Sequence, residues 1–188
     1  MSDPSDIAES HRHLKAALYV GETAERHALM GGYYKKLATL RPPAQRSRLV
    51  RRAIASYGCA RAIVDNDYQR LVWVQLHQVG PGGLPDDVDS LIARVGPLSD
   101  ARDFWVRAAE GDVRLTHLMT GGAVAADDVV AAYVHAFELR SSWRERSSVR
   151  DHLTDLSVLC RDDGLRQQID FVRTHLDEWI ERNLGRVE

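Results

Sequence analysis

The sequence predicts an all-α protein of about nine helices, paired as antiparallel hairpins that stack into a short solenoid. Three observations support this fold class. Apolar residues recur at steps of three and four along most of the chain, which is the period of an amphipathic helix. Glycine and proline gather in short clusters that suit the ends of helices. A strand pattern is restricted to residues 70–76, and no second strand is evident to pair with it.

The first three helices are expected at residues 5–20, 23–40 and 43–65. Gly21 and Pro42 end the first two of them. The third begins at a proline, whose missing N–H group costs nothing in the first turn of a helix. The apolar stripe of the second helix consists of Leu29, Tyr33, Leu37 and Leu40, and the inward row of the third consists of Leu49, Ala53, Tyr57, Ala60 and Val64.

The fourth helix is expected at residues 68–79, where apolar side chains cover more than half of the circumference, so this helix should be central. The glycine-rich loop 80–84 follows and is the predicted hinge. A fifth helix is expected at residues 85–95. It carries three carboxylates in its first turn or so, where they suit the helix dipole, namely Asp86, Asp87 and Asp89.

Gly96 and Pro97 should close the fifth helix, and Ser99 or Asp100 can cap a sixth helix that continues to Leu118. A seventh helix is expected at residues 125–140 after a Thr-Gly-Gly stop.

A capping box of Ser142 and Glu145 predicts the start of the eighth helix, which should end near Asp162. The last helix, 165–184, has apolar residues on one side and a polar outer face, as a terminal capping helix of a solenoid needs. Its apolar row consists of Leu165, Ile169, Val172, Leu176 and Ile180, and its polar face carries Arg173, Asp177 and Glu181.

The core hairpin of this prediction spans residues 23–65. Its first helix carries Met30 and Gly31, followed three residues later by Tyr34, and its second carries an alanine, an aromatic residue and an alanine at offsets of four and three, namely Ala53, Tyr57 and Ala60. Small residues allow two helices to approach closely while the aromatic ring fills the groove beside the contact, so Gly31 is expected to meet Ala53. The same offsets recur at Val129, Tyr133 and Ala136, which indicates an internal repeat.

These positions resemble the tetratricopeptide repeat, in which a Leu-Gly pair precedes a Tyr and the second helix has the Ala, aromatic, Ala pattern. Two features depart from that repeat. About ten residues more than the ~34-residue unit allows lie between Tyr34 and Ala53, and Asp65 stands where the repeat usually has proline. The region 23–160 is similar to the TRAFs-binding type of tetratricopeptide region, which occurs in bacteria beside caspase-like CHAT proteases or signalling effectors. This resemblance implies an interaction scaffold without a catalytic motif.

The 188 residues are expected to fold as one domain, 1–188. A hydrophobic content of 44% and a charged content of 28% fit a soluble globular protein, and the apolar runs are too short to span a bilayer. The acidic, polar start of the chain lacks the features of a secretory signal, which predicts a cytoplasmic protein. Cys59 and Cys160 both fall in predicted helices and are expected to be buried thiols.

The net charge of −2 conceals an unequal distribution along the chain. Residues 26–64 contain nine Lys or Arg and no Asp or Glu, so the core hairpin is basic and its flanks are acidic. Either a neighbouring acidic helix, such as the one holding Asp86 and Asp89, lies against the hairpin, or an external anionic partner does. The candidate binding residues are Lys35, Lys36, Arg46, Arg48, Arg51, Arg52 and Arg61.

Catalytic and metal-binding motifs are missing from the sequence, which contains neither Gly-x-x-x-x-Gly-Lys, Gly-x-Gly-x-x-Gly, His-Glu-x-x-His nor Gly-x-Ser-x-Gly. His11 and His13 would point about 200° apart on a helix and cannot share one ion. His117 and His135 could face one another, but core histidines are more common than general bases. The sequence therefore predicts no catalytic residue, metal or cofactor.

The preferred interpretation is a scaffold that binds another protein, possessing an acidic surface, through a groove or through the basic face of the third helix. One alternative is a nucleic-acid-binding helical module that uses the Arg46–Arg61 face, and a weaker one is a helical-bundle enzyme or cofactor carrier. A membrane partner is not expected. The four tryptophans fall on different predicted helices, so hairpin packing explains them better than a base-stacking platform, namely Trp73, Trp105, Trp143 and Trp179.

Overall fold

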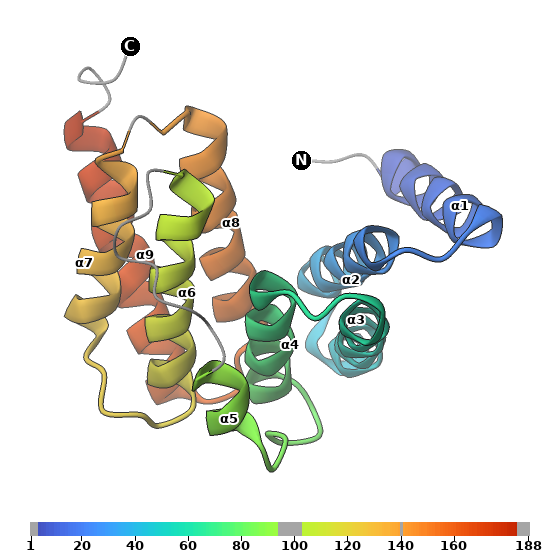
Figure 1. Ribbon diagram of the computed structural model, residues 1–188, viewed down its shortest axis with the longest axis horizontal. Helices are drawn as coiled ribbons and strands as arrows, with labels where there is room; N and C mark the ends of the chain where they lie inside the picture. The colour runs from blue at the N-terminus through green and yellow to red at the C-terminus, as the bar shows by residue number, and fades with distance from the viewer. Residues whose placement is uncertain (1–3, 94–102, 140, 184–188) are drawn as a thin grey trace. The chain divides into compact units, whose positions relative to one another are not determined.

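The computed structural model describes residues 4–93, 103–139 and 141–183, with side chains from residue 9 onward. Throughout these ranges the regular elements are α-helices, which confirms the predicted all-α class (Figure 1). The chain divides into two compact units, Met1–Gly83 and Leu84–Glu188. The boundary falls in the 80–84 loop that the sequence marks as a hinge, and the single-domain organisation stays a prediction. In the part of the chain that is described, no helix combines the length and apolar character needed to cross a bilayer.

The described part of unit 1 (Met1–Gly83) contains four helices: α1 (Pro4–Val20), α2 (Ala24–Thr39), α3 (Pro43–Ile63) and α4 (Asp67–Val79). The start of α2 is set by Thr23, whose hydroxyl oxygen accepts a hydrogen bond from the backbone N–H of Arg26 at 3.2 Å. Proline begins α3 as predicted. Residues 70–76 lie within α4, so the helical interpretation of this segment is confirmed over the strand.

The contact between α2 and α3 is built on Gly31. A Cβ atom placed there would lie 2.6 Å from Cδ2 of Tyr57, which is too close for any side chain. Tyr57 is 2% exposed, and Ala53 and Ala60 are fully buried beside it. The three atoms nearest to this Cβ position all belong to the Tyr57 ring, so the ring makes the closest contact with Gly31, and the expected contact with Ala53 stays a prediction. The glycine makes room for the ring between the two helices.

Two apolar rows differ from the prediction. In α2 the buried residues include Met30 and Ala38, whereas Leu29 and Leu40 are 53% and 54% exposed. Packing on the small residues decides which face of α2 turns towards α3, and the larger leucines are left outside. In α3 the inward row is confirmed from Leu49 to Ala60. Val64 is 54% exposed because the chain leaves the helix there with extended backbone angles.

Unit 2 (Leu84–Glu188) contains five helices within the described ranges: α5 (Val88–Ala93), α6 (Phe104–Met119), α7 (Ala126–Phe137), α8 (Trp143–Leu159) and α9 (Asp163–Asn183). The start of α5 was predicted too early, since Asp86 and Asp87 lie in a turn before the helix. Asp103 caps α6 by accepting hydrogen bonds from two backbone N–H groups. The expected cap at Ser99 or Asp100, the Gly96-Pro97 stop, and the ends at Val95, Arg140 and Leu184 lie outside the described residues.

The hairpin of α6 and α7 repeats the contact seen between α2 and α3. A Cβ atom at Gly111 would lie 2.4 Å from Cδ1 of Tyr133, just as Gly31 is covered by Tyr57. The Tyr133 hydroxyl donates a hydrogen bond to Oδ1 of Asp112 at 2.6 Å, which holds the ring over the glycine. The repeated offsets in the sequence are thus accompanied by a repeated glycine–tyrosine contact, one in each unit.

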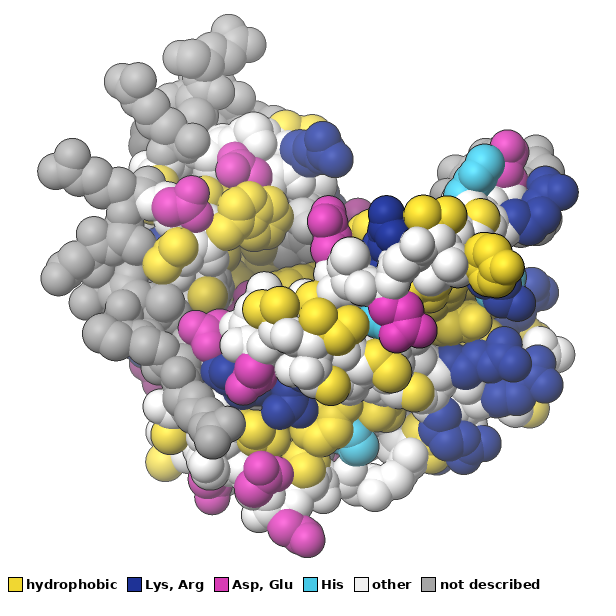
Figure 2. Space-filling model, turned by 45° about the vertical axis from the view of Figure 1, so that its right-hand side comes forward, with side chains coloured by type: hydrophobic (Ala, Val, Ile, Leu, Met, Phe, Trp, Pro, Cys, Tyr) yellow, Lys and Arg dark blue, Asp and Glu magenta, His cyan; other side chains and the backbone are white. Residues whose placement is uncertain are grey.

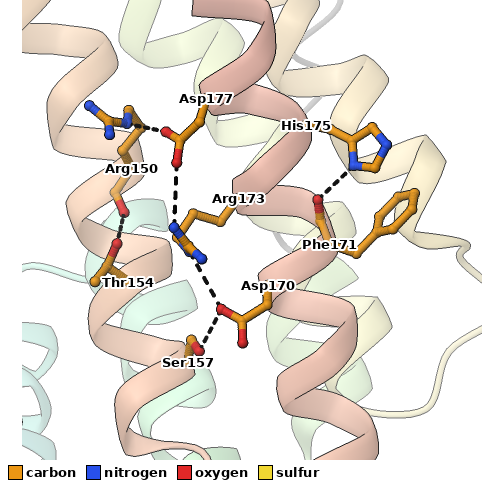
Figure 3. A network of polar contacts seen from close by, with 8 residues as sticks. All are labelled: Arg150, Thr154, Ser157, Asp170, Phe171, Arg173, His175 and Asp177. Carbon is orange, nitrogen blue, oxygen red and sulfur yellow. Dashed lines mark hydrogen bonds and ion pairs between the residues drawn. The ribbon is translucent and has the colours of Figure 1, made fainter.

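A polar network joins α8 and α9 along their length (Figure 3). Arg150 of α8 pairs with Asp177 of α9, and the Ser157 hydroxyl donates a hydrogen bond to Asp170 at 2.8 Å. Arg173 bridges both of these α9 carboxylates at 3.4 Å. Arg173 and Asp177 therefore do not form the predicted outer face, because they lie beside α8. The predicted apolar row of α9 is confirmed, since its five residues are buried.

The capping box at the start of α8 is confirmed, with the Ser142 N–H donating to the Glu145 carboxylate at 2.6 Å.

Cys160 is buried as predicted, and burial raises the pKa of its thiol. The prediction was wrong for Cys59, which is exposed. The tryptophans were expected to pack within hairpins, but Trp105 and Trp143 are 50% and 56% exposed.

Candidate binding groove

A groove of about 560 Å³ lies in unit 1, where α1, α2 and the first half of α3 meet. Its volume is within the ~300–1,000 Å³ range of typical ligand pockets. Dark-blue Lys and Arg side chains gather over unit 1, next to yellow hydrophobic side chains, at the right of Figure 2. The groove is lined by His11, Tyr33, Tyr34, Leu37, Arg41, Ala44, Gln45, Arg48, Leu49 and Arg52.

Three rings form the aromatic wall of the groove. Tyr33 and Tyr34 are consecutive on α2, with ring centroids 5.4 Å apart and an edge-on arrangement. His11 reaches them from α1 and stacks on Tyr33 with centroids 5.0 Å apart and an interplanar angle of 3°. Nε2 of His11 lies within hydrogen-bond distance of the Tyr34 hydroxyl oxygen, at 3.3 Å. The packing of α1 on α2 thus completes this wall.

Three arginines stand around these rings. Arg48 and Arg52 are one turn apart on α3 and so share a face of the helix. Arg41 lies in the turn between α2 and α3. The Arg52 guanidinium carbon is 5.5 Å from the centroid of Tyr34, a cation–π contact. All three arginines are exposed, and none of them pairs with a carboxylate in the part of the chain that the structure describes.

The groove contains only two of the seven cations predicted from sequence, Arg48 and Arg52. Arg46 instead donates a hydrogen bond from Nε to the carbonyl oxygen of Arg41 at 2.9 Å, which secures the α2–α3 turn. Lys35 is buried, at 7% exposure. Lys36 and Arg51 are exposed and do not line the groove.

Arg61 belongs to a separate cluster at the C-terminal end of α3. Its Nε atom is 3.5 Å from Asp65, and its guanidinium carbon lies 4.4 Å from the ring centroid of Trp73. Asp65 also pairs with Arg70 at 2.9 Å, and the hydrogen bond from Arg70 lowers the pKa of this carboxyl. Carboxylates therefore neutralise cations at this end of α3. The idea that acidic residues around Asp86 cover the basic face stays a prediction, since Asp86 belongs to unit 2.

Two rings of the groove have shifted pKa values. Burial lowers the pKa of His11, and the neighbouring cations Lys15 and Arg52 lower it further. Burial raises the pKa of Tyr33, with a smaller contribution from Tyr34. Among the described residues, no Asp or Glu lines the groove, so its three guanidinium groups adjoin an aromatic and apolar surface without a carboxylate from these residues. Such a surface can hold an anionic group beside a flat or apolar one.

Sequence reasoning missed Arg41 and the three rings. Arg41 lies within the basic run, but its position beside Tyr33 depends on the turn between the two helices. His11 and His13 were considered only as metal ligands, and His11 instead belongs to the aromatic wall. His117 and His135 contact different residues, with Nδ1 of His135 at 3.4 Å from Arg107 and His117 beside Gly122.

No protein-family model, curated protein or solved structure matches the chain. The resemblance of Met30, Gly31 and Tyr34 to the tetratricopeptide pattern therefore stays a prediction.

The lowered pKa of His11 predicts a loss of stability in mild acid. The unfolded chain takes up a proton near pH 6.5, the ordinary value for imidazole, whereas the folded protein takes it up only at lower pH. The free energy of unfolding contributed by His11 is therefore fully present above about pH 6.5 and is lost as the pH falls below it. We expect His11→Phe, which keeps a ring against Tyr33, to lose less stability between pH 7.5 and 5 than the parent. Denaturant unfolding at both pH values measures this difference, and equal losses would contradict the assignment.

Proposed function

We propose that this protein is a non-catalytic interaction scaffold of tetratricopeptide-like type, and that its groove binds an anionic segment of a partner protein. The observation that carries this proposal is the group formed by Arg41, Arg48 and Arg52. These are three exposed arginines around an aromatic wall, with no carboxylate among the lining residues that the structure describes. Guanidinium groups donate paired hydrogen bonds to carboxylates and phosphates, and they carry their charge at any physiological pH.

The architecture of unit 1 supports a binding role over a purely structural one. The glycine–tyrosine contact fixes α2 against α3 on the inner side, and Arg61, the cation in the last turn of α3, is neutralised by Asp65. Cations that serve folding in this unit thus have acidic or backbone partners, as Arg46, Arg61 and Arg70 do. Uncompensated cations beside a groove are more useful for recognising a partner and for steering its approach.

Nucleic acid is the second candidate ligand, because arginine and aromatic side chains also combine in grooves that bind single strands. One observation weighs against it. Arg46 and Arg61, which delimit the basic face predicted for this function, are engaged in contacts within the protein. No specific observation among the described residues favours the helical-bundle enzyme.

Affinity capture from the native host tests the proposal. The immobilised chain is incubated with lysate, with and without nuclease, and the retained protein is purified and bound again to the parent. We expect retention to survive nuclease treatment and to be displaced by an excess of polyglutamate, because the arginines recognise anions on a protein. Retention that disappears with nuclease, together with direct and strongly salt-dependent binding of an oligonucleotide, would replace the proposal with the nucleic-acid function.

A further inference from the structure

We infer that the groove recognises a phosphorylated tyrosine side chain in the partner segment, with the phosphate held by Arg41, Arg48 and Arg52 and the phenyl ring placed against the aromatic wall. This inference rests on the proposed function and specifies the chemistry of the segment that the groove binds.

The number of arginines favours a phosphate over a single carboxylate. One guanidinium group is enough for the paired hydrogen bonds of one carboxylate. The groove places three around one volume of about 560 Å³, two of them a single turn apart on α3. A phosphate carries a charge of about −1.5 to −2 at neutral pH and three acceptor oxygens, so it can engage several guanidinium groups at once. Clusters of arginine are a recurrent means of recognising phosphorylated segments.

The apolar part of the groove favours an aromatic carrier of that phosphate. Leu37, Ala44 and Leu49 line the groove together with the three rings, so much of its surface offers contacts to a flat apolar group. Phosphoserine would leave this surface without a partner, whereas the phenyl ring of phosphotyrosine covers it and places the phosphate further from the peptide backbone. Aromatic pairs with edge-on or offset geometry also add to the stability of such a contact.

His11 provides a reporter of occupancy at this position. Its imidazole faces Lys15 on its own helix, Tyr33 and Tyr34 on α2 and Arg52 on α3, and burial lowers its pKa, with further contributions from the two cations. A ligand in the groove changes both the burial of this ring and the charge around it, so the NMR signals of the His11 ring should shift when the ligand binds. A ligand bound elsewhere would leave these signals unchanged.

The experiment uses fluorescently labelled peptides with identical Gly-Ser flanks and one central residue: phosphotyrosine, tyrosine, phosphoserine or glutamate. Fluorescence anisotropy measures their dissociation constants with the full chain. We expect phosphotyrosine to bind at least about tenfold tighter than the other three peptides. Arg48→Gln or Arg52→Gln should each weaken its binding about tenfold, because each removes a charge-assisted hydrogen bond to the phosphate. Arg51→Gln, an exposed arginine of α3 outside the groove, is the matched control and should leave binding unchanged.

Several results would overturn the inference. Equal affinity for the glutamate or tyrosine peptide would show that phosphate is not recognised, and equal affinity for phosphoserine would remove the role of the aromatic wall. If inorganic phosphate displaced the phosphotyrosine peptide as well as phenyl phosphate does, the aromatic wall would likewise have no role in binding. An equal loss of binding in Arg51→Gln, or unchanged NMR signals of the His11 ring at saturation, would place the ligand outside the groove.

The failure of this inference can be separated from the failure of the proposed function. Phosphatase treatment of the lysate before capture should abolish retention of the partner if phosphotyrosine is required. Retention that persists after phosphatase treatment, and is still displaced by polyglutamate, contradicts the phosphotyrosine inference while it supports an anionic protein partner.

Discussion

Gly31→Ala is expected to destabilise unit 1 by about 1–3 kcal/mol, the usual cost of overpacking a filled site. The new Cβ atom would lie 2.6 Å from Cδ2 of Tyr57, and the ring is 2% exposed, so it has little room to move away. The loss should appear although alanine is favoured over glycine inside a helix by about 1 kcal/mol. Because a unit of this size changes its Tm by roughly 4–8 °C for each kcal/mol, thermal unfolding detects the effect easily.

Gly32→Ala is the matched control for this prediction. The two glycines are neighbours in α2, but a Cβ atom at Gly32 would lie 3.6 Å from the Tyr57 hydroxyl, an ordinary contact. This variant gains the helix propensity without the clash, so its Tm should stay the same or rise. Gly111→Ala should behave like Gly31→Ala, since its Cβ atom would meet Tyr133 at 2.4 Å. A Gly31→Ala protein as stable as Gly32→Ala would show that the glycine–tyrosine contact does not set the α2–α3 distance.

The double variant Arg48→Glu/Arg52→Glu is expected to weaken partner binding by about 100-fold or more. Each guanidinium group contributes a charge-assisted hydrogen bond of roughly 1.5–3 kcal/mol, and each 1.4 kcal/mol is about a factor of ten in affinity. Stability should hardly change, because neither arginine pairs with a carboxylate in the described ranges and exposed substitutions usually alter stability by about 0.5 kcal/mol or less. Titration calorimetry with the captured partner and thermal unfolding measure the two quantities on the same samples.

Arg51→Glu reverses a charge on the same helix without touching the groove, and it is the control for this variant. We expect a small decrease in its affinity, one that disappears at high salt because the Debye length becomes short. If Arg51→Glu alone were as damaging as the double reversal, the general basic charge of α3 would explain binding and the groove would not be needed.

Local pattern was sufficient to predict the helices and much of their packing. The period of apolar residues locates nine helical segments, and the Ala, aromatic, Ala offsets identify Ala53, Tyr57 and Ala60 as the face that packs on α2. The period of apolar residues predicted an incorrect apolar stripe for α2, which included the exposed Leu29 and Leu40. Leu29 and Met30 differ by one residue and lie about 100° apart on the helix, and only the close approach at Gly31 decides between them.

The groove could be predicted only in part for a similar reason. Arg48 and Arg52 belong to a run of basic residues that stands out along the chain. The aromatic wall does not, because His11 lies on a different helix from Tyr33 and meets it only after α1 packs against α2. The sequence also does not reveal which cations are neutralised, because Arg61 pairs with Asp65 and contacts Trp73 of α4 only in the folded protein. Tertiary packing thus separates the cations left exposed at the groove from those that contact other residues of the fold.

Photo-crosslinking from inside the groove tests the central claim most directly. A photoreactive residue at Gln45, which is exposed and lines the groove, is compared with the same residue at Arg51, which is exposed on the same helix but outside it. Both proteins are mixed with the captured partner at a concentration above the dissociation constant and irradiated. The proposed binding mode predicts a covalent partner adduct from position 45 and little or none from position 51, whereas equal or stronger labelling from position 51 would contradict it.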